Sequence, residues 1–219
     1  MNTATQPKIL VVFYSMTGNV AALARAVADG AEKEGAEVRM RQVTDTLPQS
    51  VIDSHPEIKK AKAELKPIPF ATLDDLKWAD GVAFGSPTRY GNMSSQLKQF
   101  IDTTGSLWMS GELVGKVASV FTSTATQHGG QETTLLSMMV PLFHLGFILQ
   151  GLPYTEKGQI EMNSIHGGSP YGASSVTGLG GNFKSSEVDL AMASTLGKRL
   201  AQTTSKQRAN VENKIKKTA

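Results

Sequence analysis

Near its start the chain has an unbroken apolar stretch, residues 9–14 (ILVVFY), which stops at a polar turn. After this turn the apolar residues recur every three or four positions, at Val20, Leu23, Ala24, Val27, Ala28 and Ala31. A short continuous apolar run is typical of a buried strand, and the spacing that follows is that of a helix with one buried face. The pattern therefore predicts a strand, a tight turn and a helix.

Strand-like and helix-like segments continue to alternate along the rest of the chain. Apolar runs at residues 81–85, 117–121 and 146–149 predict three more strands, and residues 37–43, where apolar and polar side chains alternate, predict a further short one. Helical patterns follow, the last of them with Leu190, Ala193, Leu196 and Leu200 on one face. Such alternation favours an α/β fold, in which a parallel sheet of five strands is doubly wound, with helices on both of its faces.

Two segments interrupt this alternation. Residues 44–72 are polar and rich in proline, contain one small predicted helix around residues 58–65, and are too long for an ordinary connection. This insertion could cover a binding site or pack on a partner subunit, and a simple surface excursion explains it equally well. The second segment is a Gly/Ser-rich stretch before the last helix.

Three polar loops follow predicted strands, at residues 15–19 (SMTGN), 86–94 (SPTRYGNMS) and 122–130 (TSTATQHGG). In a doubly wound sheet the carboxyl ends of the strands share one edge, where ligands bind. The first loop suits a phosphate, because main-chain N–H groups and the positive end of a helix dipole point into such a turn. Taken alone, it is equally explained as a helix cap. The other two loops offer polar backbone groups, and Arg89 and Tyr90, to a flat heteroaromatic ring.

Size and composition narrow the class of protein. A chain of 219 residues, 40% of them hydrophobic and 19% charged, suits one compact domain, which we expect over residues 1–203. The chain has no cysteine, which excludes disulfides, thiolate catalysis and cysteine-based metal sites. Because the N-terminal residues are polar and no apolar run has the length of a membrane span, we expect a cytoplasmic protein without membrane insertion.

The positive net charge of +3 is concentrated at the C-terminus. Residues 204–219 contain one acidic side chain, Glu212, and five basic ones: Lys206, Arg208, Lys214, Lys216 and Lys217. This segment therefore carries 5 − 1 = +4, which leaves −1 for residues 1–203. We expect a solvated basic tail and no specific nucleic-acid partner.

Motifs of other enzyme classes are incomplete. The pair Gly115 and Lys116 is followed by Val117, where an ATP-binding P-loop needs serine or threonine. Residues 178–183 lack the third glycine of a dinucleotide fingerprint and follow no strand, so we interpret them as a loop. Neither a Gly-x-Ser-x-Gly elbow nor a His-Glu-x-x-His pair occurs. The sequence therefore argues against hydrolase and metal chemistry.

Five blocks of the chain occur together in a recognisable order: YSMTGN at 14–19, GSPTRYGNM at 85–93, LWMSG at 107–111, FTSTATQHGGQE at 121–132 and GGSPYGA at 167–173. In these blocks the sequence resembles the flavodoxin-like superfamily, and more closely its tryptophan-repressor-binding-protein family of FMN-dependent NAD(P)H:quinone oxidoreductases. The resemblance runs from about residue 8 to residue 200. It implies a sheet with strand order 2-1-3-4-5, non-covalent FMN and NAD(P)H as co-substrate.

The resemblance also implies which residues bind the cofactor. The phosphate would be held by Ser15, Met16, Thr17, Gly18, Asn19 and Val20. The flavin ring would be flanked by Pro87, Thr88, Arg89, Tyr90 and Gly91. The ribityl chain and the far edge of the ring would contact Ser123, Thr124, Ala125, Thr126, Gln127, His128 and Gly129.

Two further residues match family positions near the flavin. Trp108 matches a tryptophan of the quinone pocket, with a core or interface position as the alternative. His144 matches a histidine near the flavin, although a histidine at an apolar helix end is more often a packing residue. At Thr17 several family members have an aromatic residue, so the choice between NADH and NADPH does not carry over.

The implied reaction is a two-electron, ping-pong reduction of quinones, with the flavin performing the chemistry and no side-chain nucleophile. The resemblance also implies a homotetramer and a protective role in oxidative stress. The alternative is a flavodoxin-type carrier that passes single electrons to a protein partner. Such carriers are usually shorter and acidic, whereas this chain is nearly neutral over residues 1–203 and has long extra segments.

Overall fold

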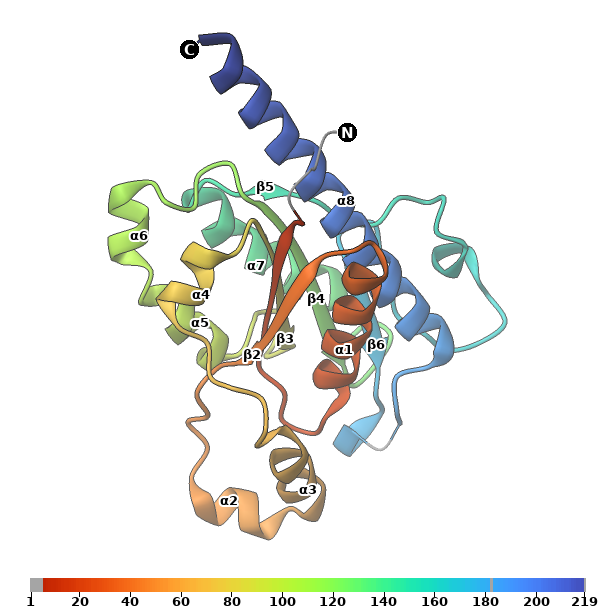
Figure 1. The fold of residues 1–219 in the computed structure, drawn as a ribbon. Helices are drawn as coiled ribbons and strands as arrows, with labels where there is room; N and C mark the ends of the chain where they lie inside the picture. The colour runs from red at the N-terminus through yellow and green to blue at the C-terminus, as the bar shows by residue number, and fades with distance from the viewer. Residues whose placement is uncertain (1–5, 182, 219) are drawn as a thin grey trace.

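The computed structural model describes residues 6–181 and 183–218, and shows a parallel sheet between two layers of helices (Figure 1). The strands of the described chain are β1 (Lys8–Phe13), β2 (Glu37–Gln42), β3 (Gly81–Pro87), β4 (Val117–Thr124), β5 (Ile148–Leu149) and β6 (Ala173–Val176). The order β2-β1-β3-β4-β5 confirms the expected fold.

The helices divide between the two faces of the sheet and its carboxyl edge. One face carries α1 (Asn19–Lys33) and α8 (Glu187–Thr218), and the other carries α4 (Leu73–Trp78), α5 (Ser95–Asp102), α6 (Gly105–Ser110) and α7 (Gln131–His144) (Figure 1). Beyond the carboxyl edge lie α2 (Gln49–Ser54) and α3 (Pro56–Leu65), and two short 3₁₀ helices are η1 (Lys157–Ile160) and η2 (Leu179–Gly181). None of the described helices is both long and apolar enough to cross a membrane.

The two faces of β1 explain its unbroken apolar run. Ile9, Val11 and Phe13 belong to the core beneath α1 and α8. Leu10 and Val12 belong to the core on the opposite face. Successive side chains of a strand point to opposite faces, so a strand covered on both sides is apolar at every position.

The fifth strand position is filled by two segments, which corrects the expectation of a five-stranded sheet. β5 pairs with the start of β4, where Val117 lies opposite Ile148, and β6 pairs with its end, where Thr124 lies opposite Val176. Residues 150–172 form an excursion between the two. The predicted strand at 146–149 is shorter than expected because Gly146, at φ +81°, and Phe147 follow α7 and donate their N–H groups back to the carbonyl oxygens of Phe143 and Leu142.

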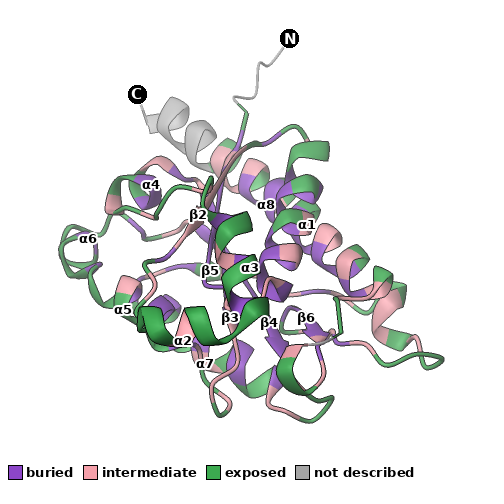
Figure 2. Ribbon diagram, turned by 90° about the horizontal axis from the view of Figure 1, so that it is seen from below, coloured by how far each residue is buried: buried purple, intermediate pink, exposed green. Residues whose placement is uncertain are grey.

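The insertion at residues 44–72 contains the predicted helix, α3, and a second helix, α2. Pro56 occupies the first turn of α3, where its missing N–H costs nothing. Ile58, Ala61 and Leu65 are buried, whereas α2 has no buried residue (Figure 2). The insertion is therefore anchored through one face of α3.

The expected basic tail continues the last helix. α8 runs through residue 204 without a break, and Thr204 is fully buried. The guanidinium of Arg208 lies 2.7 Å from the carboxylate of Asp80. The boundary expected at residue 203 therefore falls inside α8, and the solvated basic tail stays a prediction.

Candidate functional site

The turn between β1 and α1 is built around the side chain of Ser15. This residue is buried, and its Oγ accepts hydrogen bonds from the main-chain N–H groups of Gly18 and Ala21, both at 3.2 Å. Gly18 has φ +95°, a conformation that glycine adopts without steric cost. Together these residues turn the chain sharply from the strand into α1.

Four main-chain N–H groups in this turn donate to no acceptor among the described residues. They are those of Met16, Thr17, Asn19 and Val20. The first N–H groups of a helix have no partner within the helix, and they lie at the positive end of its dipole. The turn is thus suited to hold a phosphate group by its backbone.

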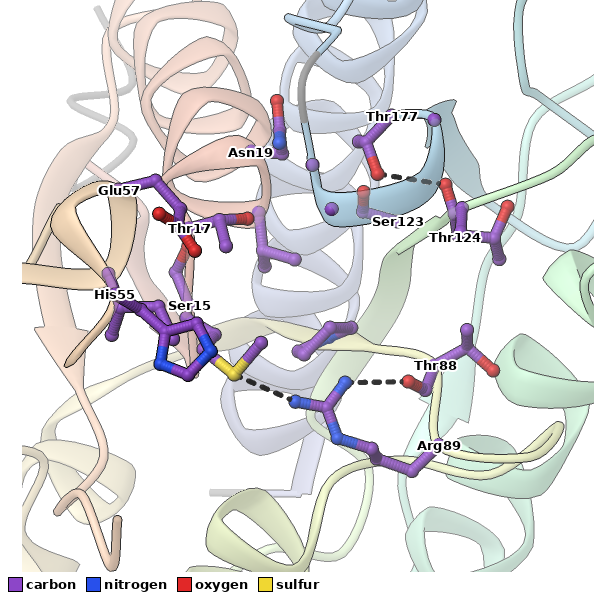
Figure 3. A pocket seen from close by; sticks show the side chains of 18 of the residues that line it. Ser15, Thr17, Asn19, His55, Glu57, Thr88, Arg89, Ser123, Thr124 and Thr177 are labelled. Atoms are coloured by element: carbon purple, nitrogen blue, oxygen red, sulfur yellow. Dashed lines mark hydrogen bonds between the residues drawn. The ribbon is translucent and has the colours of Figure 1, made fainter. Parts of the chain in front are cut away.

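A cavity of about 410 Å³ lies beside this turn, at the carboxyl edge of the sheet (Figure 3). It brings together residues from all three predicted loops: Ser15, Met16, Thr17, Asn19 and Val20 from the first, Pro87, Thr88 and Arg89 from the second, and Ser123, Thr124 and Ala125 from the third. The loops converge because β1, β3 and β4 are parallel neighbours, so their carboxyl ends share an edge.

The rest of the predicted set does not line this cavity: Gly18, Tyr90, Gly91, Thr126, Gln127, His128 and Gly129. Gly18 shapes the first turn, and Tyr90 and Gly91, both at positive φ, form the tip of the second loop. The side chains of Tyr90 and His128 are exposed. Thr126 and Gln127 line a neighbouring cavity of about 510 Å³.

Arg89 connects the second loop to the first. Its guanidinium donates to the carbonyl oxygen of Thr88 at 2.9 Å and to the sulfur of Met16 at 3.3 Å (Figure 3). A planar guanidinium held in this way can lie against an aromatic ring or face a polar ring edge. Arg89 is therefore the cation best placed to contact a flat ligand.

The second loop is held by hydroxyl groups. Thr88 Oγ1 accepts from the N–H of Gly91 at 3.2 Å and from the hydroxyl of Thr134 at 2.8 Å. Thr134 is fully buried on α7. Because these bonds are made within the protein, the loop is shaped before a ligand arrives.

Two walls of the cavity were not assigned from the sequence. Val51, His55, Glu57 and Ile58 come from the insertion, and Thr177, Gly178, Gly180 and Gly181 follow β6. His55 and Glu57 stand across the cavity from Thr124 (Figure 3). Of the alternatives left open for the insertion, the structure favours covering the site, and its unusual length was the one signal in the sequence.

The segment that follows β6 forms one side of the cavity. It is hydrogen-bonded to β4 and lies close to the turn between β1 and α1. The N–H and hydroxyl of Thr177 both donate to the carbonyl oxygen of Thr124, at 2.8 and 3.1 Å. A Cβ placed on Gly181 would lie 3.0 Å from Thr17 Oγ1. The segment interpreted as a loop at 178–183 contains the short 3₁₀ helix η2, and Gly178, Gly180 and Gly181 line the cavity, while residue 182 lies outside the described residues.

Tyr14 lies directly before the first turn, but its hydroxyl is not available as a proton donor to a ligand in the cavity. It is 1% exposed, and its hydroxyl donates to Asp45 at 3.1 Å. Burial, and secondly the charge of Asp45, raise the pKa of Tyr14 well above its ordinary value. Metal ligands are also lacking, since no three His, Asp or Glu side chains of the described residues form a candidate metal site.

Trp108 and His144 lie away from the cavity within one chain. Trp108, on α6, is 55% exposed and does not line the cavity. His144 is the last residue of α7, whose first residue is near the third loop. At 1.5 Å per residue, a helix of 14 residues places His144 roughly 20 Å from that end. A single chain therefore does not bring these two side chains to the site.

Comparison with known proteins gives a family match over most of the chain. The model of the family described as NADPH-dependent FMN reductase matches residues 7–153. A protein from Geotalea uraniireducens (strain Rf4) named NAD(P)H dehydrogenase (quinone) is 50% identical over 195 residues, which cover 89% of this chain and 96% of that protein. A protein of the same name from Syntrophobacter fumaroxidans is 47% identical over 204 residues, covering 93% of this chain and 100% of the relative.

Solved structures with lower identity share the fold. The flavodoxin, WrbA-like protein from Agrobacterium tumefaciens has a TM-score of 0.57 at 22% identity, covering 92% of this chain and 99% of that one. A flavodoxin from the domain Archaea has a TM-score of 0.58 at 21% identity, covering 90% and 98%. At this identity the likeness supports the flavodoxin-like fold alone.

Proposed function

The chain belongs to the NADPH-dependent FMN reductase family, and we propose that it is an FMN-dependent NAD(P)H:quinone oxidoreductase. The relatives named NAD(P)H dehydrogenase (quinone), which this chain matches over nearly their full length, support this activity. The structural observation that carries it is the row of four main-chain N–H groups at the start of α1, which have no acceptor within the described part of the chain and lie beside a cavity of about 410 Å³. The four N–H groups can donate hydrogen bonds to a phosphate group. The loops around them offer the polar groups that a flavin ring and its ribityl chain need.

Each of the three loops has a proposed role toward FMN, which when bound supplies the hydride and electron transfer. The turn from Ser15 to Val20 would hold the phosphate. Pro87, Thr88 and Arg89 would contact the ring, with Tyr90 and Gly91 forming the tip of that loop. Residues 123–129 would hold the ribityl chain and the far ring edge. The chain's own part is binding, orientation and exclusion of water, without a nucleophile.

We also propose a homotetramer, in which a neighbouring chain completes each pocket. Trp108 and His144 lie outside the cavity of their own chain, so they can serve a site only across a subunit contact. Exposed apolar side chains lie close to them in the sequence, with Met109 76% and Phe143 64% exposed. Where such side chains form one contiguous patch, the patch is characteristic of a protein contact.

Three expectations from the sequence remain part of the proposal: a cytoplasmic location, a protective role in oxidative stress, and the absence of a specific nucleic-acid partner. The family relationship supports the first two. The third rests on the distribution of net charge along the sequence, which is +4 over residues 204–219 and −1 over residues 1–203.

A steady-state assay tests the activity. Protein saturated with FMN is mixed with NADH or NADPH at several fixed benzoquinone concentrations, and nicotinamide oxidation is followed. Turnover with parallel double-reciprocal lines is expected, because both substrates would use the same exposed face of the flavin in turn. Bound flavin without quinone turnover would contradict the proposal and favour the one-electron carrier.

A further inference from the structure

Lys62 reaches the phosphate turn from the insertion. It lies on α3, and its ammonium donates to the carbonyl oxygen of Ser15 at 2.8 Å. The same nitrogen lies 2.5 Å from the carboxylate of Asp45 and 4.5 Å from the centre of the Tyr14 ring. The side chains of Lys62 and Asp45 are only 18% and 23% exposed. The ammonium therefore has three fixed neighbours and one defined position.

The bond to Ser15 sets the direction of the peptide that opens the turn. In a trans peptide the carbonyl oxygen and the following N–H point in opposite directions, and the described chain has no cis peptide. With the Ser15 carbonyl held by Lys62, the N–H of Met16 points away from Lys62. Met16 lines the cavity and its N–H has no protein acceptor among the described residues. A reversed peptide would present an oxygen where the phosphate needs a donor.

Asp45 keeps Lys62 in this position. Its carboxylate also accepts from the hydroxyl of Tyr14 at 3.1 Å and from the N–H of Leu47 at 2.9 Å. Burial acts to raise the pKa of Asp45, but the bonds from Lys62 and Leu47 outweigh burial and hold the pKa below its usual range. Asp45 is thus ionised at neutral pH and balances the charge of Lys62, so Lys62 acts by geometry rather than by excess charge.

We propose that Lys62 is a positioning residue for the FMN phosphate, which fixes the Ser15–Met16 peptide so that the N–H groups of the turn meet the ligand. This inference rests on the proposed binding of FMN. The proposed role of Lys62 is distinct from the anchoring of the insertion, because Ile58, Ala61 and Leu65 anchor α3 through their buried side chains.

The experiment compares FMN with riboflavin, which has the same ring and ribityl chain but no phosphate. Dissociation constants are measured by quenching of flavin fluorescence with the full chain. For Lys62→Met the FMN dissociation constant should rise about tenfold, as expected for the loss of one charged hydrogen bond, and that of riboflavin should change less than about twofold. Lys62→Arg, which keeps a donor, should restore most of the FMN affinity.

The matched control is Lys59→Met on the same helix. Lys59 is 65% exposed and pairs with Asp53, away from the turn, so both dissociation constants should stay at the wild-type values. Since Lys62→Met leaves the Asp45 carboxylate without the cation that balances its charge, the uncharged double variant Asp45→Asn, Lys62→Met is measured as well. It should show the same loss for FMN and none for riboflavin.

Three results would overturn the inference. One is an FMN affinity that does not change in either Lys62→Met variant. Another is an equal weakening of FMN and riboflavin, which would mean that the whole cavity has loosened. The third is wild-type protein that binds neither flavin, which would refute the proposed function itself and the role of Lys62 with it.

Discussion

At the scale of single residues, Asp75 shows how one carboxylate joins two elements. It is 5% exposed and accepts from the N–H and hydroxyl of Thr72, which forms a reciprocal cap at the start of α4. The same carboxylate bonds Arg41 at 3.1 Å and Arg39 at 3.4 Å, both on β2. Burial acts to raise the pKa of Asp75, but the bonds from Arg41 and Thr72 outweigh burial and hold the pKa below its usual range.

Asp75→Asn should lower the free energy of unfolding by about 2 kcal/mol at pH 7, because two arginines lose their anion. The folded pKa lies below the unfolded value of about 4, so the stabilisation is complete above that value and disappears as the pH falls through the folded pKa. Urea unfolding at pH 7 and in acid should therefore show a difference between wild type and variant that narrows in acid.

Asp74→Asn provides the control for this prediction. The side chain of Asp74 is 89% exposed, and its pair with Lys77 should contribute less than about 0.5 kcal/mol. A difference between Asp75→Asn and wild type that persists unchanged in acid would show that the charge of Asp75 is not the source of the stabilisation.

At the scale of elements, α1 and α8 approach each other backbone to backbone. A Cβ on Gly30 would lie 1.9 Å from the carbonyl oxygen of Ser194, and a Cβ on Gly197 would lie 1.9 Å from that of Val27. The two glycines therefore permit the contact from opposite sides. This packing holds α1, and with it the phosphate turn at its start, against the sheet.

Gly30→Ala sets two effects against each other. Alanine favours the helix by about 1 kcal/mol over glycine, but its methyl group would force the helices apart at a cost of typically 1–3 kcal/mol or more. Because the overlap is with backbone, we expect a net loss of about 2 kcal/mol in urea unfolding. Gly105→Ala, whose Cβ would meet nothing within 4 Å, should leave stability nearly unchanged. A Gly30→Ala variant as stable as wild type would contradict the packing argument.

At the scale of the whole molecule, the site of one chain lacks the two residues that resemble family positions near the flavin. The cavity contains parts of all three loops, yet Trp108 lies on the exposed surface of α6. If Trp108 takes part in quinone binding, it must do so from a neighbouring chain. Assembly and substrate binding are then linked.

Trp108→Ala should raise the quinone KM by about tenfold while changing the FMN dissociation constant less than about twofold, since aromatic anchors often contribute more than 1 kcal/mol to a contact. Light scattering of wild type and variant should both give the mass of four chains. A wild-type monomer with full activity would refute the shared pocket. A joint loss of FMN and quinone binding would make Trp108 a structural residue.

Much of the fold and of the candidate site could be predicted because the signals are local. The apolar run at residues 9–14, the helical spacing after Val20 and the polar loops after three strands all depend on neighbours in sequence. Parallel strands then bring those loops to one edge. The division of the fifth strand position between β5 and β6 could not be predicted in this way, because β6 follows a long excursion and has no extended apolar run.

What the sequence by itself determined is the order of the strands β1 to β5 along the chain, the parallel sheet and the three loops that contribute to the cavity. Only the tertiary structure decided the remaining walls, with His55 and Gly181 among them, and the contact between Lys62 and Ser15, which lie 47 positions apart. Periodicity reports which face of an element is buried. It does not report which distant side chain meets that face, because this depends on how the whole chain packs.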